Sequence, residues 1–148
     1  MPPIKTVIEI SRPVEVVFAY ATEPAHFSEW QDDVVTARRE GDLSPGVGSV
    51  FTVVRRIGRS HQAMTHEVTE CRPPLVWAAR GVDGPIRSRL VITVEPLAGT
   101  TGSRLTSVLE LEPHGIGHLL VPLVARRQAA RLVPVSYQRL KARLESQA

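Results

Sequence analysis

Four side chains in this sequence are of the types that carry out acid–base chemistry beside a carbonyl group: Arg55, His66, Arg80 and Tyr137. Removing a proton from the carbon next to a carbonyl needs a base, and the resulting enolate oxygen needs hydrogen-bond donors. These residues suit such a reaction if their side chains share one interior face. The alternative interpretation puts both arginines in solvent and makes His66 an ordinary strand residue. Because a β-bulge reverses the facing of every later side chain, the sequence leaves both interpretations open.

Other catalytic chemistries find less support in the sequence. A metal site needs several converging His, Cys or carboxylate groups, and none of the five histidines has the His-Glu-x-x-His spacing of a helical zinc site. The single cysteine, Cys71, is interpreted as a small buried apolar residue rather than a nucleophile. The segment Gly46-Val47-Gly48 matches no nucleotide-binding fingerprint and predicts a hairpin turn. We therefore expect neither a metal nor a cofactor.

Composition places the chain among globular proteins. It has 148 residues, of which 43% are hydrophobic and 22% charged, and no apolar run approaches the ~20 residues that span a bilayer. The single cysteine and the absence of a signal-peptide pattern predict a cytoplasmic location. The formal net charge is only +3. Basic residues gather near the end of the chain, but with few aromatic residues to stack on bases we interpret them as a solvated helix face and expect no nucleic-acid partner.

The order of expected elements is strand, two short helices, six strands and a long helix. Strands are expected at residues 5–11, 34–40, 49–57, 60–72, 75–80, 86–95 and 103–112. Short helices are expected at 14–21, with Ser11 as N-cap, and around 24–30. Short turns between successive strands predict an antiparallel sheet.

The long helix is expected from about residue 118 to 145. Its apolar stripe comprises Leu119, Leu123, Ala130, Val133, Tyr137, Leu140 and Leu144. Pro134 lies inside this helix, where it lacks the N–H that would bond to the carbonyl of Ala130. Because the stripe keeps its phase beyond Pro134, the sequence predicts a bend rather than a break. The half before the bend is expected to lie over the mouth of a cavity.

The whole chain, residues 1–148, is expected to form one α+β domain. About seven antiparallel strands are too many for a flat sheet, so the sheet should curl around the long helix. A curled sheet and a helix close imperfectly, and ligands occupy such gaps. The residues expected to line this cavity are Trp30, Trp77, Leu90, Leu119, Leu123, Val133 and Tyr137. For the two tryptophans, simple core packing is the alternative interpretation.

The sequence resembles the START-like, or Bet v 1-like, helix-grip superfamily, and within it the bacterial polyketide cyclase/dehydrase and lipid-transport (SRPBCC) group. The matching stretches follow one another along nearly the whole chain: residues 12–18 (RPVEVVF), 27–30 (FSEW), 46–49 (GVGS), 67–74 (EVTECRPP) and 140–145 (LKARLE). Pro134 departs from the uninterrupted closing helix of that group. The resemblance implies a cavity between sheet and helix for lipids, polyketides or other apolar molecules, but no single reaction.

Three functions remain open at this point. The first is binding or carriage of a small apolar molecule, for which the sequence shows a cavity fold but no convincing catalytic set. The second is a cyclase or dehydrase acting on polyketide-type compounds, with acid–base groups lining that cavity. The third is an interaction module that uses the basic closing helix, and a homodimer is also compatible with the sequence.

Overall fold

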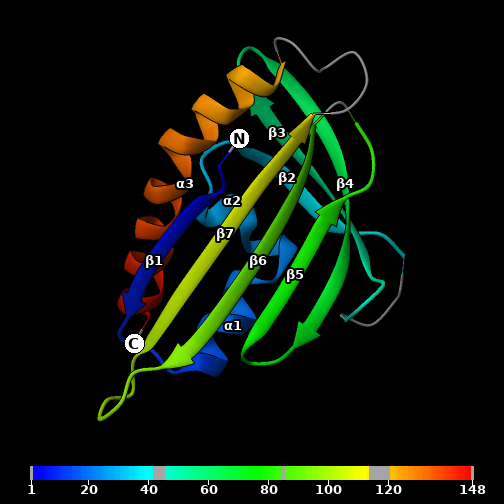
Figure 1. Ribbon diagram of the computed structural model, residues 1–148. Coiled ribbons are helices and arrows are strands. Elements are labelled where there is room, and N and C mark those ends of the chain that lie inside the picture. Colours follow the sequence, from blue (N-terminus) through cyan, green and yellow to red (C-terminus); the bar gives the residue numbers. More distant parts are fainter. Residues whose placement is uncertain (1, 42–45, 85, 114–120, 148) are drawn as a thin grey trace.

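The computed structural model describes residues 2–41, 46–84, 86–113 and 121–147 of the chain. The N-terminal part comprises β1 (Ile4–Ile10), α1 (Val14–Ala21), the 3-10 turn η1 (Pro24–His26) and α2 (Phe27–Trp30). Six strands and a helix follow (Figure 1): β2 (Val34–Arg39), β3 (Val50–Ile57), β4 (Ser60–Arg72), β5 (Val76–Gly81), β6 (Ile86–Pro96), β7 (Ser103–Pro113) and α3 (Val121–Ser146). No helix in these described ranges is long and apolar enough to cross a membrane.

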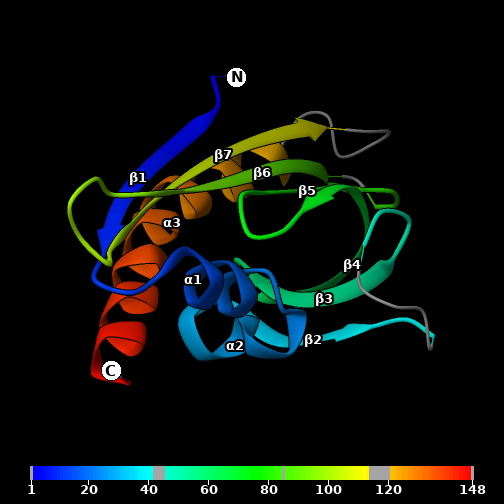
Figure 2. The same ribbon diagram turned by 90° about the horizontal axis from the view of Figure 1, so that it is seen from below.

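The strands form one antiparallel sheet in the order β1-β7-β6-β5-β4-β3-β2. Strands β2 to β7 each pair with their neighbours in sequence, whereas β1 pairs with β7, for example Ile10 with Ser103. Figure 2 shows the sheet curling around α3, with α1 and α2 on the same concave side. The predicted α+β helix-grip fold is confirmed.

The core lies between the concave face of the sheet and the helices. In β6, the predicted alternation is confirmed, because Ile86, Ile92 and Val94 are buried on the inner face. The C-terminal half of α3 contributes Tyr137, Leu140 and Leu144, each at most 4% exposed, to the same core. Burial of these apolar side chains is the main favourable contribution to folding.

Two expectations about the helices need correction. Ser11 does not cap α1: Pro13 occupies the N-cap position without a side-chain hydrogen bond, and the backbone N–H of Ser11 instead donates to Glu145 on α3. Leu123 and Ala130 do not extend the buried stripe, since the Leu123 side chain is 49% exposed and Ala130 is exposed as well. Helix α3 continues without a break through Pro134, and Leu119 lies outside the described residues.

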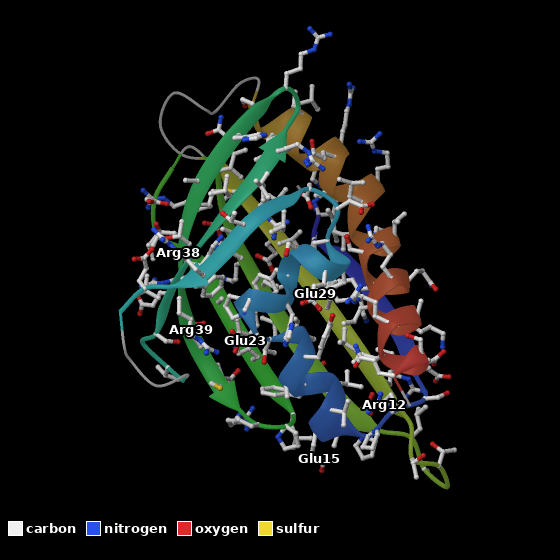
Figure 3. The ribbon with its side chains drawn as sticks, turned by 180° about the vertical axis from the view of Figure 1, so that it is seen from behind. Arg12, Glu15, Glu23, Glu29, Arg38 and Arg39 are labelled. Carbon is white, nitrogen blue, oxygen red and sulfur yellow. The ribbon has the colours of Figure 1, made fainter. Side chains whose placement is uncertain are left out.

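The C-terminal half of α3 is fastened to the N-terminal elements (Figure 3). The guanidinium of Arg12 donates to the carbonyl of Leu144 at 2.6 Å, and Lys141 donates to the carbonyl of Glu9 at 2.6 Å. Two basic residues of α3 also form ion pairs with carboxylates of the N-terminal part, Arg139 with Asp32 and Arg143 with Glu29, while Lys141 pairs with Glu145 within the helix. Part of the basic face expected to be solvated therefore holds the helix in place.

Candidate functional site

A cavity of about 140 Å³ lies between the concave face of the sheet and α3. Strands β3 to β7 supply its floor, and α2 closes one side with Phe27 and Trp30. The N-terminal half of α3 covers it with Ala125, Ala129 and Val133, among others. Two of these residues are alanines, whose short side chains take up little of the space between the helix and the sheet.

Aromatic rings form a continuous series along the cavity wall. Phe51 on β3 stacks on His66 of the paired strand β4, with 5.1 Å between ring centroids, and touches Phe27 edge-on at 5.9 Å. Trp30 continues the series to Tyr137 on α3, at a centroid distance of 5.1 Å. The rings therefore connect the sheet to the helix and give this part of the cavity wall flat surfaces.

Two titratable groups in the wall are held in their neutral forms. Burial, and then the positive charge of Arg55, lowers the pKa of His66 to about 4, against the opposing charge of Asp83. Burial raises the pKa of Tyr137 to about 12, while the nearby Ser107 hydroxyl and the charge of Arg55 act in the opposite direction. At neutral pH the site therefore offers an uncharged imidazole and a protonated phenol.

The guanidinium of Arg55 is paired with a carboxylate within the site. Its guanidinium lies 3.2 Å from both carboxylate oxygens of Asp33, which follows α2. Both residues line the cavity and both are partly buried. The pair is joined by Gln128 of α3, whose amide nitrogen lies 3.5 Å from Asp33 and donates to the carbonyl of Arg56 at 2.5 Å. One edge of the cavity is thus closed by a polar cluster whose charges compensate.

The structure brings three of the four acid–base candidates, Arg55, His66 and Tyr137, to one cavity. Arg80 lies elsewhere: its side chain is 56% exposed, pairs with Glu67 at 3.9 Å and is not part of the lining. Arg80 directly opposes Glu67 across the β4–β5 pair, and that register directs both side chains away from the cavity.

Most residues expected to line the cavity are found there: Trp30, Trp77, Leu90, Val133 and Tyr137. Leu123 is exposed and does not contribute to the lining. Sequence reasoning missed Asp33, Ser107 and Gln128. Ser107 follows the clear alternation of β7 and was recognisable as an inward position, but nothing in the sequence marked Asp33 or Gln128. No group of three or more metal-ligating side chains converges among the described residues.

The fold and the cavity define the class of protein, a helix-grip domain with a hollow between sheet and closing helix. A family model described as "Polyketide cyclase / dehydrase and lipid transport" matches residues 1–145, and the chain belongs to this family. No curated protein matches the sequence.

Solved structures repeat the fold at low sequence identity. TTHA0849 from Thermus thermophilus is 15% identical, with a TM-score of 0.80 and 99% of each chain covered. A START superfamily protein from Mycobacterium smegmatis is 13% identical, with a TM-score of 0.77 and 99% of each chain covered. The di-domain ARO/CYC protein BexL of the BE-7585A biosynthetic pathway is 14% identical, with a TM-score of 0.68; the match covers 97% of this chain and 48% of BexL. At these identities the likeness concerns the fold.

Proposed function

We propose that the protein binds a small apolar molecule in the cavity between the sheet and α3. The observation that carries the proposal is the cavity itself, walled by aromatic and aliphatic side chains and only partly closed by the small residues of α3. Ligand sites are typically concave, mostly apolar and supplied with a few placed polar groups. The family to which the chain belongs includes lipid transport in its description, which agrees with carriage as well as binding.

The volume of the cavity limits the size of the ligand that it can hold. A cavity of about 150 Å³ in another protein admits benzene, so a volume of this order suits one or two rings or a short chain. The aromatic series from Phe51 to Tyr137 provides stacking surfaces for a flat molecule. As part of this proposal the protein acts in the cytoplasm as a binder of such compounds.

A variant that fills the cavity tests the proposal. Ala129 on α3 lines the cavity and Ala130 beside it is exposed, so Ala129→Trp and Ala130→Trp form a matched pair. The neutral two-ring fluorescent probe 6-propionyl-2-dimethylaminonaphthalene reports binding by the blue shift and increase of its emission in apolar surroundings. We expect Ala129→Trp to weaken binding by about tenfold or more, a loss of at least ~1.4 kcal/mol, and Ala130→Trp to leave it unchanged. Equal binding by all three proteins would place the ligand elsewhere.

A second candidate function is supported by the convergence of His66, Arg55 and Tyr137. In a cyclase, His66 would take the proton from the carbon beside a carbonyl, and the Tyr137 hydroxyl would donate to the enolate oxygen. The enolate carbon would then attack a second carbonyl of the same chain, and the oxygen of that carbonyl would take the proton back from His66 as its π bond breaks. Because the pKa of His66 is lowered to about 4, it is a weak base at neutral pH, and we rank this candidate second.

Proton exchange tests the second candidate without knowledge of the substrate. In D₂O, a catalytic base would speed the exchange of the methyl protons of 2-acetonaphthone, which NMR follows directly. We expect any acceleration by the native protein to be lost in His66→Phe. A native rate equal to that in buffer would remove the cyclase candidate while leaving the binding proposal intact.

A further inference from the structure

Three polar atoms in the cavity wall have no hydrogen-bond partner within the described part of the chain. They are Nε1 of Trp30, Nε2 of His66 and Oγ of Ser107. Their residues are 2%, 8% and 0% exposed and all three line the cavity. The other two such atoms, on Thr6 and Arg87, belong to residues outside the lining. Buried polar atoms are normally hydrogen-bonded, so this concentration calls for an explanation.

The three atoms come from separate elements that meet at the aromatic series. Trp30 on α2 packs against Tyr137, and the Ser107 hydroxyl on β7 lies near the hydroxyl of Tyr137 but outside hydrogen-bond geometry. Arg55 is close enough to influence the charge states of both His66 and Tyr137. Two of the unpartnered atoms, on Trp30 and Ser107, therefore belong to residues beside Tyr137, and the third, on His66, belongs to the ring that stacks on Phe51 in the same wall.

The chemistry of these atoms favours an uncharged oxygen. The indole N–H of Trp30 can only donate, and the hydroxyl of Ser107 can donate or accept. The imidazole of His66 is neutral at neutral pH because its pKa is lowered to about 4, so it brings a hydrogen bond without a charge. Among the described lining residues, the only guanidinium belongs to Arg55, which is already paired with Asp33. A buried carboxylate would therefore find donors but no free cation in this part of the wall to compensate its charge.

We infer that the cavity selects ligands that carry a neutral oxygen, such as a ketone or an alcohol, on a flat apolar body, and discriminates against carboxylates of the same shape. The inference rests on the proposed function and adds the class of ligand. The oxygen would accept from Trp30 and Ser107, with His66 as a further partner. A free fatty acid or aromatic acid would be a poor ligand for the same site.

Three probes of similar shape separate the contributions of the neutral oxygen, the apolar body and a negative charge to the affinity. 2-Acetonaphthone carries the ketone, 2-isopropylnaphthalene replaces it by a hydrocarbon group, and 2-naphthoate carries a carboxylate. Isothermal titration at neutral pH should show the ketone binding about three- to tenfold more tightly than the hydrocarbon, the range expected for one or two net hydrogen bonds. The carboxylate should bind at least about tenfold more weakly than the ketone.

Substitutions at the wall assign the preference to the named atoms. Ser107→Ala removes one hydroxyl, and Thr106→Ala, its neighbour on β7 outside the lining, is the control. His66→Phe keeps the stacking on Phe51 and removes Nε2, and circular dichroism checks its folding. In Ser107→Ala and His66→Phe the ratio of ketone to hydrocarbon affinity should fall toward one, while hydrocarbon binding stays. Thr106→Ala should behave as the native protein.

The outcomes of these experiments test this inference separately from the proposed function on which it rests. Equal binding of ketone and hydrocarbon, or tightest binding of the carboxylate, would overturn the inference and leave apolar binding in place. A ketone preference unchanged in Ser107→Ala and His66→Phe would also overturn it. If His66→Phe does not fold, Ser107→Ala alone decides. Failure of all three probes to bind would overturn the proposed function and the inference together.

Discussion

The side-chain oxygen of Gln128 on α3 accepts a hydrogen bond from the backbone N–H of Gly58, in the turn between β3 and β4, at 3.1 Å. The amide nitrogen of the same side chain donates to the carbonyl of Arg56 at 2.5 Å. One side chain thus uses both ends of its amide to tie the N-terminal half of α3 to the β3–β4 turn. Because Gln128 also lines the cavity, the tie lies at its rim.

Gln128→Leu should loosen this rim. The variant keeps the apolar part of the side chain and loses the hydrogen bonds, so we expect the free energy of unfolding to fall by about 1 kcal/mol and bound probe to dissociate several-fold faster. Urea unfolding and stopped-flow fluorescence measure the two effects. Gln138→Leu, at an exposed position of the same helix, is the control. A dissociation rate equal to that of the native protein would show that ligands reach the cavity by another route.

Stability should fall as the pH is lowered from 6.5 to 4. The pKa of His66 is about 4 in the folded protein and ordinarily 6.5, so in this interval the unfolded chain binds a proton that the folded protein does not. Above pH 6.5 neither state is protonated and the contribution is constant. The full difference corresponds to about 3 kcal/mol at most. Urea unfolding at several pH values measures it.

The matched variants for this pH effect are His66→Phe and His61→Gln. The first should flatten the fall in stability between pH 6.5 and 4, because the buried imidazole is gone. The second changes an exposed histidine of the same strand and should leave the profile as it is. An NMR titration in which the His66 ring protonates near pH 6.5 would contradict the assignment.

Pro134→Ala should stabilise the protein. Alanine restores the N–H that can bond to the carbonyl of Ala130, and Pro134 is exposed, so little packing is lost. We expect a gain of about 1–3 kcal/mol and a higher Tm by thermal unfolding. If the helix bends at Pro134 as the sequence predicts, and this bend controls access to the cavity, probe uptake should also change. A variant with unchanged Tm and uptake would refute the idea that the helix hinges there.

Asp33→Asn should change which ligands the cavity accepts. The substitution removes the carboxylate that pairs with Arg55 and leaves the guanidinium free at the cavity. We expect the affinity for 2-naphthoate to rise by about tenfold relative to 2-acetonaphthone, since the buried carboxylate then has a cation. Glu67→Gln, which removes the partner of the exposed Arg80, is the control and should leave the ratio of affinities unchanged. An unchanged ratio in Asp33→Asn would mean that Arg55 does not reach the bound ligand.

The strands and their order along the chain could be predicted from the sequence, because alternation of apolar and polar residues and the turn residues are local signals. Residues 86–95 alternate clearly, and the structure buries Ile86, Ile92 and Val94 as expected. Strand 60–72 was predicted with the bounds that β4 has. The stripe on the long helix correctly indicated Tyr137, Leu140 and Leu144 as core residues.

The site was less predictable because it depends on register and on distant contacts. Whether Arg55 or Arg80 lines the cavity depends on which face of each strand turns inward. The sequence does not show this, because the β4–β5 pairing shifts register between Val68 and Glu70. Helical spacing alone placed Leu123 with the core, although at that end of α3 the side chain meets solvent rather than the sheet. Asp33 and Gln128 join the site through contacts between distant parts of the chain: Asp33 pairs with Arg55, which is 22 positions later, and Gln128 bonds to Arg56, which is 72 positions earlier.

The sheet order has a consequence for how the chain folds. Among themselves, strands β2 to β7 pair only with sequence neighbours, so each hairpin closes a short loop and forms early. The pairing of β1 with β7 and the docking of α3 on β1 join segments about a hundred or more residues apart, so the first must wait for β7 and the second for α3 to be synthesised. Until then α1 and α2 can pack on the concave face, but the part that contacts α3 stays uncovered. On the ribosome, this apolar face is the surface most exposed to aggregation and the one a chaperone would recognise.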